Sequence, residues 1–459
     1  MSSIVVQKFG GTSVQDAPAM RRAIDIVAEH GIKRGVRPLV VLSACAGVTN
    51  SLIRIGELAL LGKFDEAHKI ISALDERHFT IVRDLTLGTR AEQESALELR
   101  FIWRELRTLV RGIELLGELT PRMKDKLLSA GERASTAIFA HAIREYLTGR
   151  GIGAQLCDAK DFFITDSSFT RARPQIPEIT KQMKPLVKKM LSGTVCITQG
   201  FIGSTKRGET TTIGRGGSDF SATIMGVASG AKEIQIWTDV AGIYTCDPRI
   251  VPEAYAQQVV NFADASAMAF YGAKVLHPET IGPAVEAGIP VRVLSSKEPE
   301  QSGTTIVMST TDAEPLTGIA VMRNVSLVQI RSGELVPSTT MLPLVFDTLS
   351  EKKIVPLVTS LSFDNALLAL ASEQEVRELQ TSLTGLADIE VLHEQALVTL
   401  IGHGLEHSSG VASRLFSAVK KVNCEMISYG GAPNALSIII PESVVERAVK
   451  RIHNEFFSV

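Results

Sequence analysis

The stretch SIVVQKFGGTS, residues 3–13, joins a strand signal to a turn signal and decides how the N-terminal part of the chain folds. The β-branched residues at 4–6 favour an extended strand, and the glycines at 10 and 11 favour a tight turn after it. Further short β-branched runs alternate with longer helical stretches: residues 37–44, 153–159, 194–200, 233–239 and 290–296. Strands that alternate with helices predict an α/β fold with a largely parallel sheet, covered by helices on both faces.

A helical insert separates the second and third predicted strands. Its apolar residues recur at intervals of three and four: Leu99, Ile102, Leu106, Leu109, Ile113 and Leu116. This spacing places them on one face of a helix, which we expect to pack against a neighbouring element.

The composition is that of a globular protein, with 459 residues of which 45% are hydrophobic and 21% charged. This length predicts two or three domains. The net charge is −2 and no long basic run is present, which argues against nucleic-acid binding. We therefore expect small molecules or further copies of the chain as partners.

The five cysteines are scattered and form no CxxC pair, which argues against a disulfide framework and against a zinc site. We expect a protein of the reducing cytoplasm with no metal ligands of its own. The N-terminus lacks the pattern of a signal peptide, and no apolar run reaches the roughly 18 residues that span a bilayer. No membrane association is expected.

The composition changes at residues 298–318, where Pro, Gly, Ser, Thr and acidic residues mix as in a connection between domains. From residue 396 the predicted order is strand, helix, strand, strand, helix, which is most of a βαββαβ unit. A looser version of this order begins at residue 325. We therefore predict an N-terminal domain over 1–297, a connection over 298–318, and two ferredoxin-like units over 319–392 and 393–459.

Two glycine-rich stretches, KFGGTS (8–13) and TTTIGRGGSD (210–219), are typical of anion binding, because glycines let main-chain N–H groups approach a ligand. Alone, the first is also explained as simple turn chemistry. Neither the P-loop pattern nor GxGxxG is present. The residues that we single out here are Lys8, Gly10, Gly11, Arg215, Gly216, Gly217 and Asp219.

Four other stretches carry polar residues near predicted element ends: LSACAGVTN (42–50), LLSAGERAS (127–135), WTDVAGIYTCDPR (237–249) and YGAKVLHP (271–278). Each has a simpler explanation, namely a hydroxyl N-cap, an acid that complements a helix dipole, a turn at Asp247, and a solvated lysine. The candidates are Ser43, Thr49, Glu132, Thr238, Asp239, Tyr244, Arg249 and Lys274.

These motifs occur together and in one order, with GFIGS (200–204) before TTTIGRGGSD and FYGAKVLHP near residue 275. Together they resemble the aspartokinases of the amino acid kinase family, most closely the lysine-sensitive bacterial type, over essentially the whole chain. The C-terminal units resemble ACT domains. The resemblance implies a three-layer α/β/α kinase domain over residues 1–297 that is followed by two ACT units.

The implied activity is transfer of the γ-phosphoryl group of Mg-ATP to the side-chain carboxylate of L-aspartate, which gives 4-phospho-L-aspartate. This is the entry step to lysine, threonine and methionine synthesis. The resemblance makes Lys8 and Asp219 catalytic, with Mg²⁺ bound mainly through the nucleotide phosphates. It assigns aspartate to Ser43, Thr49, Glu132, Phe201, Arg215, Gly216, Gly217 and Ser218. It assigns ATP to Lys8, Gly10, Gly11, Thr238, Asp239, Tyr244, Arg249, Lys274 and Val275.

The sequence departs from the family pattern at two places. Ala267 stands where a second Glu is common, and we have no physical account of that change. In the first ACT unit, the stretch ELVPSTTMLPL replaces a helix start rich in Met, Ser and Gly, and Leu357 stands opposite an Asp of the lysine-sensitive relatives. An ammonium-bearing effector would lack its counter-ion there. We expect another amino-acid effector, or a role in forming a homodimer or a dimer of dimers.

Two other functions compete with this hypothesis. One is another amino acid kinase, such as one that phosphorylates glutamate. The other is a catalytically silent ACT regulator that keeps the kinase fold for binding. Lys8 and Asp219 argue against the silent regulator, and the contexts of Arg215 and Glu132 together with paired ACT units favour aspartate over glutamate.

Overall fold

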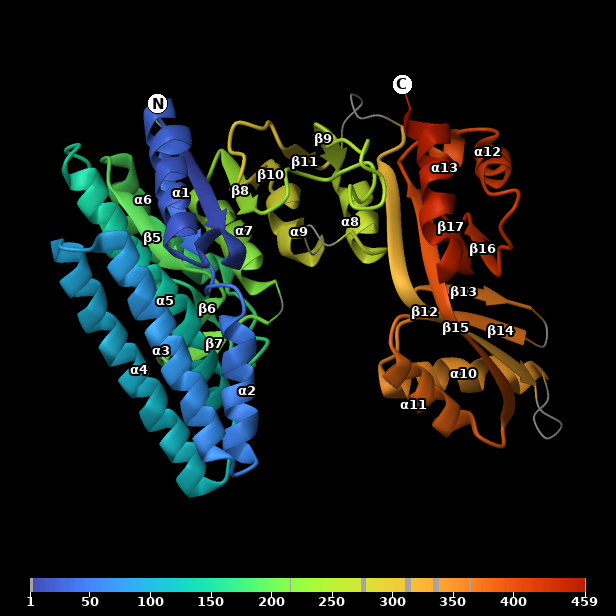
Figure 1. The fold of residues 1–459 in the computed structure, drawn as a ribbon, viewed down its shortest axis with the longest axis horizontal. Coiled ribbons are helices and arrows are strands. Elements are labelled where there is room, and N and C mark those ends of the chain that lie inside the picture. Colours follow the sequence, from blue (N-terminus) through green and yellow to red (C-terminus); the bar gives the residue numbers. More distant parts are fainter. Residues whose placement is uncertain are drawn as a thin grey trace. The chain divides into compact units, whose positions relative to one another are not determined.

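The computed structural model describes residues 3–214, 216–273, 278–309, 315–332, 338–362 and 365–458. The chain forms two compact units, residues 1–242 with 276–309 and residues 243–275 with 310–459. The first holds a mostly parallel sheet and the second an antiparallel sheet (Figure 1). Residues 243–275 lie inside the predicted N-terminal domain of residues 1–297, yet they group with the C-terminal part of the chain.

The sheet of the first unit has β1 (Ile4–Phe9) near its centre, with the strand order β3-β5-β2-β1-β8-β10-β11 within this unit. All neighbours in this order are parallel except β10 and β11. Every residue of β1 is buried, as in a parallel sheet covered on both faces. The other strands are β2 (Arg37–Leu42), β3 (Ala154–Leu156), β5 (Val195–Gln199), β8 (Glu233–Thr238), β10 (Val291–Ser295) and β11 (Thr304–Val307).

Helices pack on this sheet and on one another. Helix α7 contacts β1, α6 and α9, whereas α5 contacts β3, β5, α2 and α4. The family's α/β/α arrangement is thereby confirmed for this unit. The helices are α1 (Ala17–Ile26), α2 (Val48–Leu60), α3 (Phe64–Thr86), α4 (Arg90–Leu116), α5 (Pro121–Thr148), α6 (Ile176–Leu191), α7 (Gly217–Ser229) and α9 (Pro278–Glu286). A small side sheet comprises β4 (Ile164–Thr165), β6 (Ile202–Thr205) and β7 (Thr210–Thr212).

The predicted apolar face of the insert lies on α4. Leu116 is an exception, with 70% of its surface exposed, because it is the last residue of the helix and Gly117 follows it with φ 67°. The buried members of the face are Leu99, Ile102, Leu106 and Ile113, which Trp103 and Val110 extend. The helical periodicity therefore located this contact correctly except at Leu109, which is half-buried, and at Leu116.

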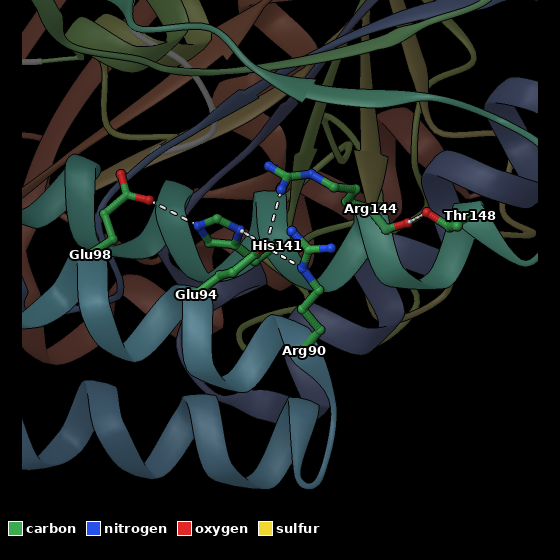
Figure 2. Close-up of polar contacts among 6 residues, drawn as sticks. All are labelled: Arg90, Glu94, Glu98, His141, Arg144 and Thr148. Carbon is green, nitrogen blue, oxygen red and sulfur yellow. Dashed lines mark hydrogen bonds and ion pairs between the residues drawn. The ribbon is translucent and has the colours of Figure 1, made fainter.

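A polar cluster ties α4 to α5 beside that apolar contact (Figure 2). His141 of α5 lies between Glu94 and Glu98 of α4, with Nδ1 3.2 Å and Nε2 2.9 Å from their carboxylate oxygens. Arg144 donates to the same oxygen of Glu94 at 3.1 Å, and Arg90 donates to its other oxygen at 2.7 Å. The cluster thus fixes the register of the two helices along their polar edge.

The second unit is built on a sheet with the order β13-β14-β12-β15-β17-β16. Its two long strands, β12 (Gly318–Ser332) and β15 (Ala387–Ile401), pair antiparallel from end to end, with an irregularity between Met322 and Leu327. The other strands are β13 (Val358–Leu361), β14 (Asn365–Leu370), β16 (Met426–Tyr429) and β17 (Ala435–Pro441). The helices are α10 (Ser338–Lys352), α11 (Glu373–Leu383), α12 (Val411–Ala418) and α13 (Val445–Phe457). Residues 243–275 add the short strand β9 (Val259–Asn261) and helix α8 (Phe262–Phe270) to this unit.

Each long strand serves both ferredoxin-like units. In the first ferredoxin-like unit, the second half of β12 and the first half of β15 flank α10, β13, β14 and α11. This is a complete βαββαβ order. The sequence showed only most of the second unit, and the structure supplies its missing strand from Gly318–Met322, which pairs with the end of β15. The chain therefore passes from the first ferredoxin-like unit to the second inside β15. Among the described helices, none has the length and apolar character of a membrane span.

Candidate active site

The carboxyl end of the central strand β1 carries a buried ion pair. Lys8 is 7% exposed, and its Nζ lies 2.5 Å from Oδ1 of Asp219 in the first turn of α7. The two residues are far apart in sequence, and the pair brings KFGGTS and TTTIGRGGSD together as the sequence predicted. A single ammonium held at a parallel sheet's carboxyl edge is suited to an anionic ligand.

Glycines line the turn that follows Lys8. Gly10 donates its N–H to the Trp237 carbonyl of β8 at 3.0 Å. A Cβ on Gly11 would come within 2.9 Å of the Ala44 carbonyl oxygen, and Ala46 donates its N–H to Gly11 at 3.1 Å. The turns after β1 and β2 are therefore pressed together, so Gly11 tolerates no side chain without a backbone shift.

A second close approach joins the turn after β5 to the start of α7. Phe201 has φ 64°, which is rare for a bulky side chain and is typical of strain held at a functional site. A Cβ on Gly217 would lie 2.6 Å from the Phe201 ring, and a Cβ on Gly200 would lie 2.7 Å from Cβ of Ser218. The structure thus brings Phe201, Gly217 and Ser218 together, and Gly216 precedes Gly217 with φ 69°.

Glu132 of α5 is 3% exposed and lies against the turn after β2. Burial raises its pKa to about 8, while a hydrogen bond from the Ala44 backbone acts in the opposite direction. One of its carboxylate oxygens, Oε2, has no hydrogen-bond partner. Close by, Ser135 donates to the Ser43 carbonyl at 2.7 Å. The arrangement presents an acidic group with unused acceptor capacity next to Ser43, a natural place for a cationic ligand group.

The residues predicted to bind the nucleotide are divided between the two units. Thr238 and Asp239 follow β8 in the first unit, and the Thr238 hydroxyl donates to Asp239 at 3.2 Å. Tyr244 and Arg249 belong to the second unit. Arg249 donates there to Asp247 at 2.7 Å, and this guanidinium holds the pKa of Asp247 below its usual range. Thr49 lies in the first turn of α2. Arg215, Lys274 and Val275 lie outside the described residues, so their roles stay predictions from the sequence.

Sequence reasoning missed a buried acid beside this site. Asp125 of α5 has no exposed surface and accepts hydrogen bonds from Thr170 and Thr212. It lies two positions before the LLSAGERAS stretch, and nothing in the linear sequence distinguishes it from a solvated acid at a helix start. Only its partners, which are 45 and 87 positions away, reveal it.

Comparison with known proteins gives consistent results. Residues 3–295 match the amino acid kinase family, and residues 398–456 match an ACT domain. The chain is similar to lysine-sensitive aspartokinase 3 of Escherichia coli (strain K12), with 36% identity and full coverage of both chains. A crystal structure of E. coli aspartokinase III in complex with aspartate and ADP (R-state) superposes with a TM-score of 0.81 at 35% identity, over 99% of this chain and 100% of the other. Another, in complex with lysine and aspartate (T-state), gives 0.85 at 36% identity with full coverage of both. These matches confirm the resemblance inferred from the motifs.

Proposed function

Because the chain belongs to the aspartokinases of the amino acid kinase family, we propose that Lys8, Asp219 and the strand ends around them are the site where it phosphorylates L-aspartate with ATP. The product is 4-phospho-L-aspartate, from which lysine, threonine and methionine synthesis start. The observation that carries the assignment is the buried Lys8–Asp219 pair at the carboxyl end of the central strand.

The chemistry explains why this site is rich in fixed positive charge. The side-chain carboxylate of aspartate has a pKa of about 3.9, so it is ionised at neutral pH and needs no general base. The obstacle is the repulsion between this anion and the phosphate chain. Catalysis of phosphoryl transfer is mainly positioning and charge neutralisation. Lys8 supplies the charge at the phosphoryl group in flight, and Asp219 holds the Lys8 ammonium in place.

Aspartate is proposed to lie between the turn after β2 and the start of α7. Glu132 faces its ammonium group, and Arg215 grips a carboxylate as the family resemblance implies. Ser43, Thr49, Phe201 and Ser218 complete the pocket, with the N–H groups of Gly216 and Gly217. The support is the packing of Phe201 against Gly217 and the unused oxygen of Glu132.

ATP is proposed to bind with its phosphates at Gly10 and Gly11 and the remainder toward Thr238 and Asp239. Tyr244, Arg249, Lys274 and Val275 complete the nucleotide set by resemblance. Among the residues that the structure describes, no three His, Cys, Asp or Glu side chains gather as metal ligands. As the resemblance implies, Mg²⁺ is assigned to the nucleotide phosphates, where it neutralises charge on the transferred group.

One assay tests this function against its two rivals. The purified protein is incubated with ATP, Mg²⁺ and hydroxylamine, which converts an acyl phosphate to a coloured hydroxamate. We expect hydroxamate with L-aspartate and none with L-glutamate. Product with glutamate alone would identify a different amino acid kinase, and no product with either would identify a silent regulator.

The binding of aspartate should depend on pH through Glu132. Its pKa of about 8 leaves it protonated at neutral pH, whereas the ammonium of aspartate needs the carboxylate, so binding releases a proton. The KM for aspartate is expected to fall by up to about tenfold from pH 6 to pH 7, because the ionised fraction rises by that factor. Steady-state kinetics in a constant-ionic-strength buffer series measure this.

Two variants separate Glu132 from its neighbours. Glu132→Gln should raise the KM and flatten its pH dependence. Glu105→Gln is the matched control, because Glu105 is ion-paired with Arg133 at 2.7 Å and its pKa is lowered, which leaves the aspartate pH profile unchanged. A Glu132→Gln profile that parallels the wild type would remove Glu132 from the ammonium site.

We expect lysine to be a poor effector of this chain. Leu357, opposite the acid of lysine-sensitive relatives, packs beside the apolar cluster around Leu327 and Val358 and offers no counter-ion to an ammonium group. Of the stretch ELVPSTTMLPL, residues 334–337 lie outside the described residues, and the remainder begins α10. Aspartate kinase activity should change less than twofold at millimolar lysine. Strong inhibition would instead show that another acidic residue supplies the counter-ion to the lysine ammonium group. If lysine has little effect, the ACT units bind a different amino acid or serve in self-association. Sedimentation measures the self-association.

A further inference from the structure

A buried carboxylate, that of Asp125, joins the loop that contains Thr170 to the end of β7. Asp125 accepts the N–H of Thr170 with both oxygens, at 3.0 and 2.9 Å, and the N–H of Thr212 at 3.0 Å. The Thr212 hydroxyl donates to Oδ1 at 2.5 Å. All four donor contacts are neutral, and burial raises the pKa of Asp125 while these hydrogen bonds oppose the rise. So many aligned donors around one acid with no exposed surface define a rigid junction.

The junction fixes a strained segment. Thr170 has φ 72°, a conformation that is costly for a β-branched residue and persists only where its surroundings impose it. Its N–H, directed at Asp125, is one such constraint. Two residues later, Ala172 donates its N–H to the Thr212 carbonyl at 3.0 Å. Thr212 is therefore fixed at three groups: its N–H and its hydroxyl bind Asp125, and its carbonyl accepts from Ala172.

Thr212 is the last residue of β7, and the chain runs directly from it into the start of α7. Ile213 donates its N–H to the Phe201 carbonyl at 3.2 Å, and Gly217 donates to the Gly214 carbonyl at 3.1 Å. The Gly214 Cα faces the Thr170 carbonyl, since a Cβ there would lie 3.5 Å from that oxygen. The positions of Ile213, Gly214 and Gly217 thus depend on where Thr212 and Thr170 are held.

We propose that Asp125 is a positioning residue for the amino acid substrate: through Thr212 and Thr170 it sets residues 213–214 and 216–217 in the geometry that binds aspartate. The inference rests on the proposed function, because that function assigns Gly216, Gly217 and Arg215 to aspartate. Among the described residues, Asp125 accepts its hydrogen bonds from Thr170 and Thr212 and none from Lys8. Replacing Asp125 should therefore weaken aspartate binding and leave the chemical step and nucleotide binding unchanged.

The test compares Asp125→Asn with the wild type under saturating ATP and then under saturating aspartate. Asn offers one acceptor and turns an amide donor toward an N–H, so the junction loosens. The KM for aspartate should rise about tenfold or more, since small misplacements of binding groups cost up to about 100-fold. The KM for ATP and kcat should stay within about twofold. Thr212→Val, which deletes only the hydroxyl donor, should shift the aspartate KM in the same direction by less, and Thr212→Ser should restore it.

The matched control is Asp166→Asn. Asp166 also braces the loop that contains Thr170, accepting N–H groups of Ser168 at 3.0 Å and Arg173 at 2.9 Å, but it does not contact Thr212. It should raise the KM for aspartate less than Asp125→Asn does, because Asp166 holds only the Thr170 side of the junction, and it should leave kcat and the KM for ATP unchanged. The proposal is overturned if Asp125→Asn and Thr212→Val leave the aspartate KM unchanged, or if both KM values and kcat deteriorate together with the melting temperature. Wild-type hydroxamate formation with aspartate tests the proposed function separately.

Discussion

Replacing Lys8 by Met is expected to lower kcat about 10²- to 10³-fold, the usual effect of deleting one preorganised electrostatic group from a transition state. Methionine keeps most of the side chain's length but removes the charge that we propose neutralises the phosphoryl group in transfer. KM for aspartate should change little, because the interaction is made mainly in the transition state. The hydroxamate assay measures kcat, and calorimetric ADP binding checks that the site is still formed.

The chain offers a matched control for this substitution. Lys33 and Glu29 form an ion pair with the same 2.5 Å separation as Lys8 and Asp219, but Lys33 is 67% exposed. Lys33→Met should leave turnover intact, and Lys8→Arg should retain part of it because the charge remains. Wild-type turnover in Lys8→Met would contradict the catalytic assignment of this lysine.

Replacing Asp264 by Ala is expected to destabilise the second unit by at least about 3 kcal/mol, because buried donors left without an acceptor cost about 1–3 kcal/mol each. Asp264 lies in the first turn of α8 and has no exposed surface. Its carboxylate accepts from Asn261 at 2.9 Å, Thr317 at 2.7 Å, the His403 N–H at 3.1 Å and Asn434 at 2.9 Å. Alanine would strand all of these donors at once.

Calorimetry of the full chain measures the loss, and hydrogen exchange locates it. Faster exchange is expected at residues 261–270 and 402–405, which Asp264 joins. Asp388→Ala is the control, because Asp388 of β15 is exposed. If Asp264→Ala kept the wild-type melting temperature, the donors that bind Asp264 would have found other acceptors. The Asp264 carboxylate would then have no stabilising role.

Asp264 also links the two family-matched regions of the chain. It lies within residues 3–295, which match the amino acid kinase family, whereas His403 and Asn434 lie within residues 398–456, which match an ACT domain. All of these residues belong to the second compact unit. Part of the kinase sequence is therefore built into the fold of the ACT sheet.

Local sequence determined the elements and the central pair of the site. Alternating β-branched runs and helical stretches predicted the parallel sheet, because strand and helix propensities act over a few residues. The glycines after Lys8 and before Asp219 marked the turns that place these residues at one edge. The order of the motifs along the chain, rather than any single motif, indicated the family.

Tertiary structure alone decided the rest. Asp125 and Asp264 look like ordinary acids in the sequence, and their burial depends on partners 87 and 170 positions away. The sharing of β12 and β15 by both ferredoxin-like units, and the grouping of residues 243–275 with the second unit, were equally hidden. The physical reason is that propensities and turns are read from neighbours, whereas a buried polar group is defined by whichever distant donors the packing brings to it.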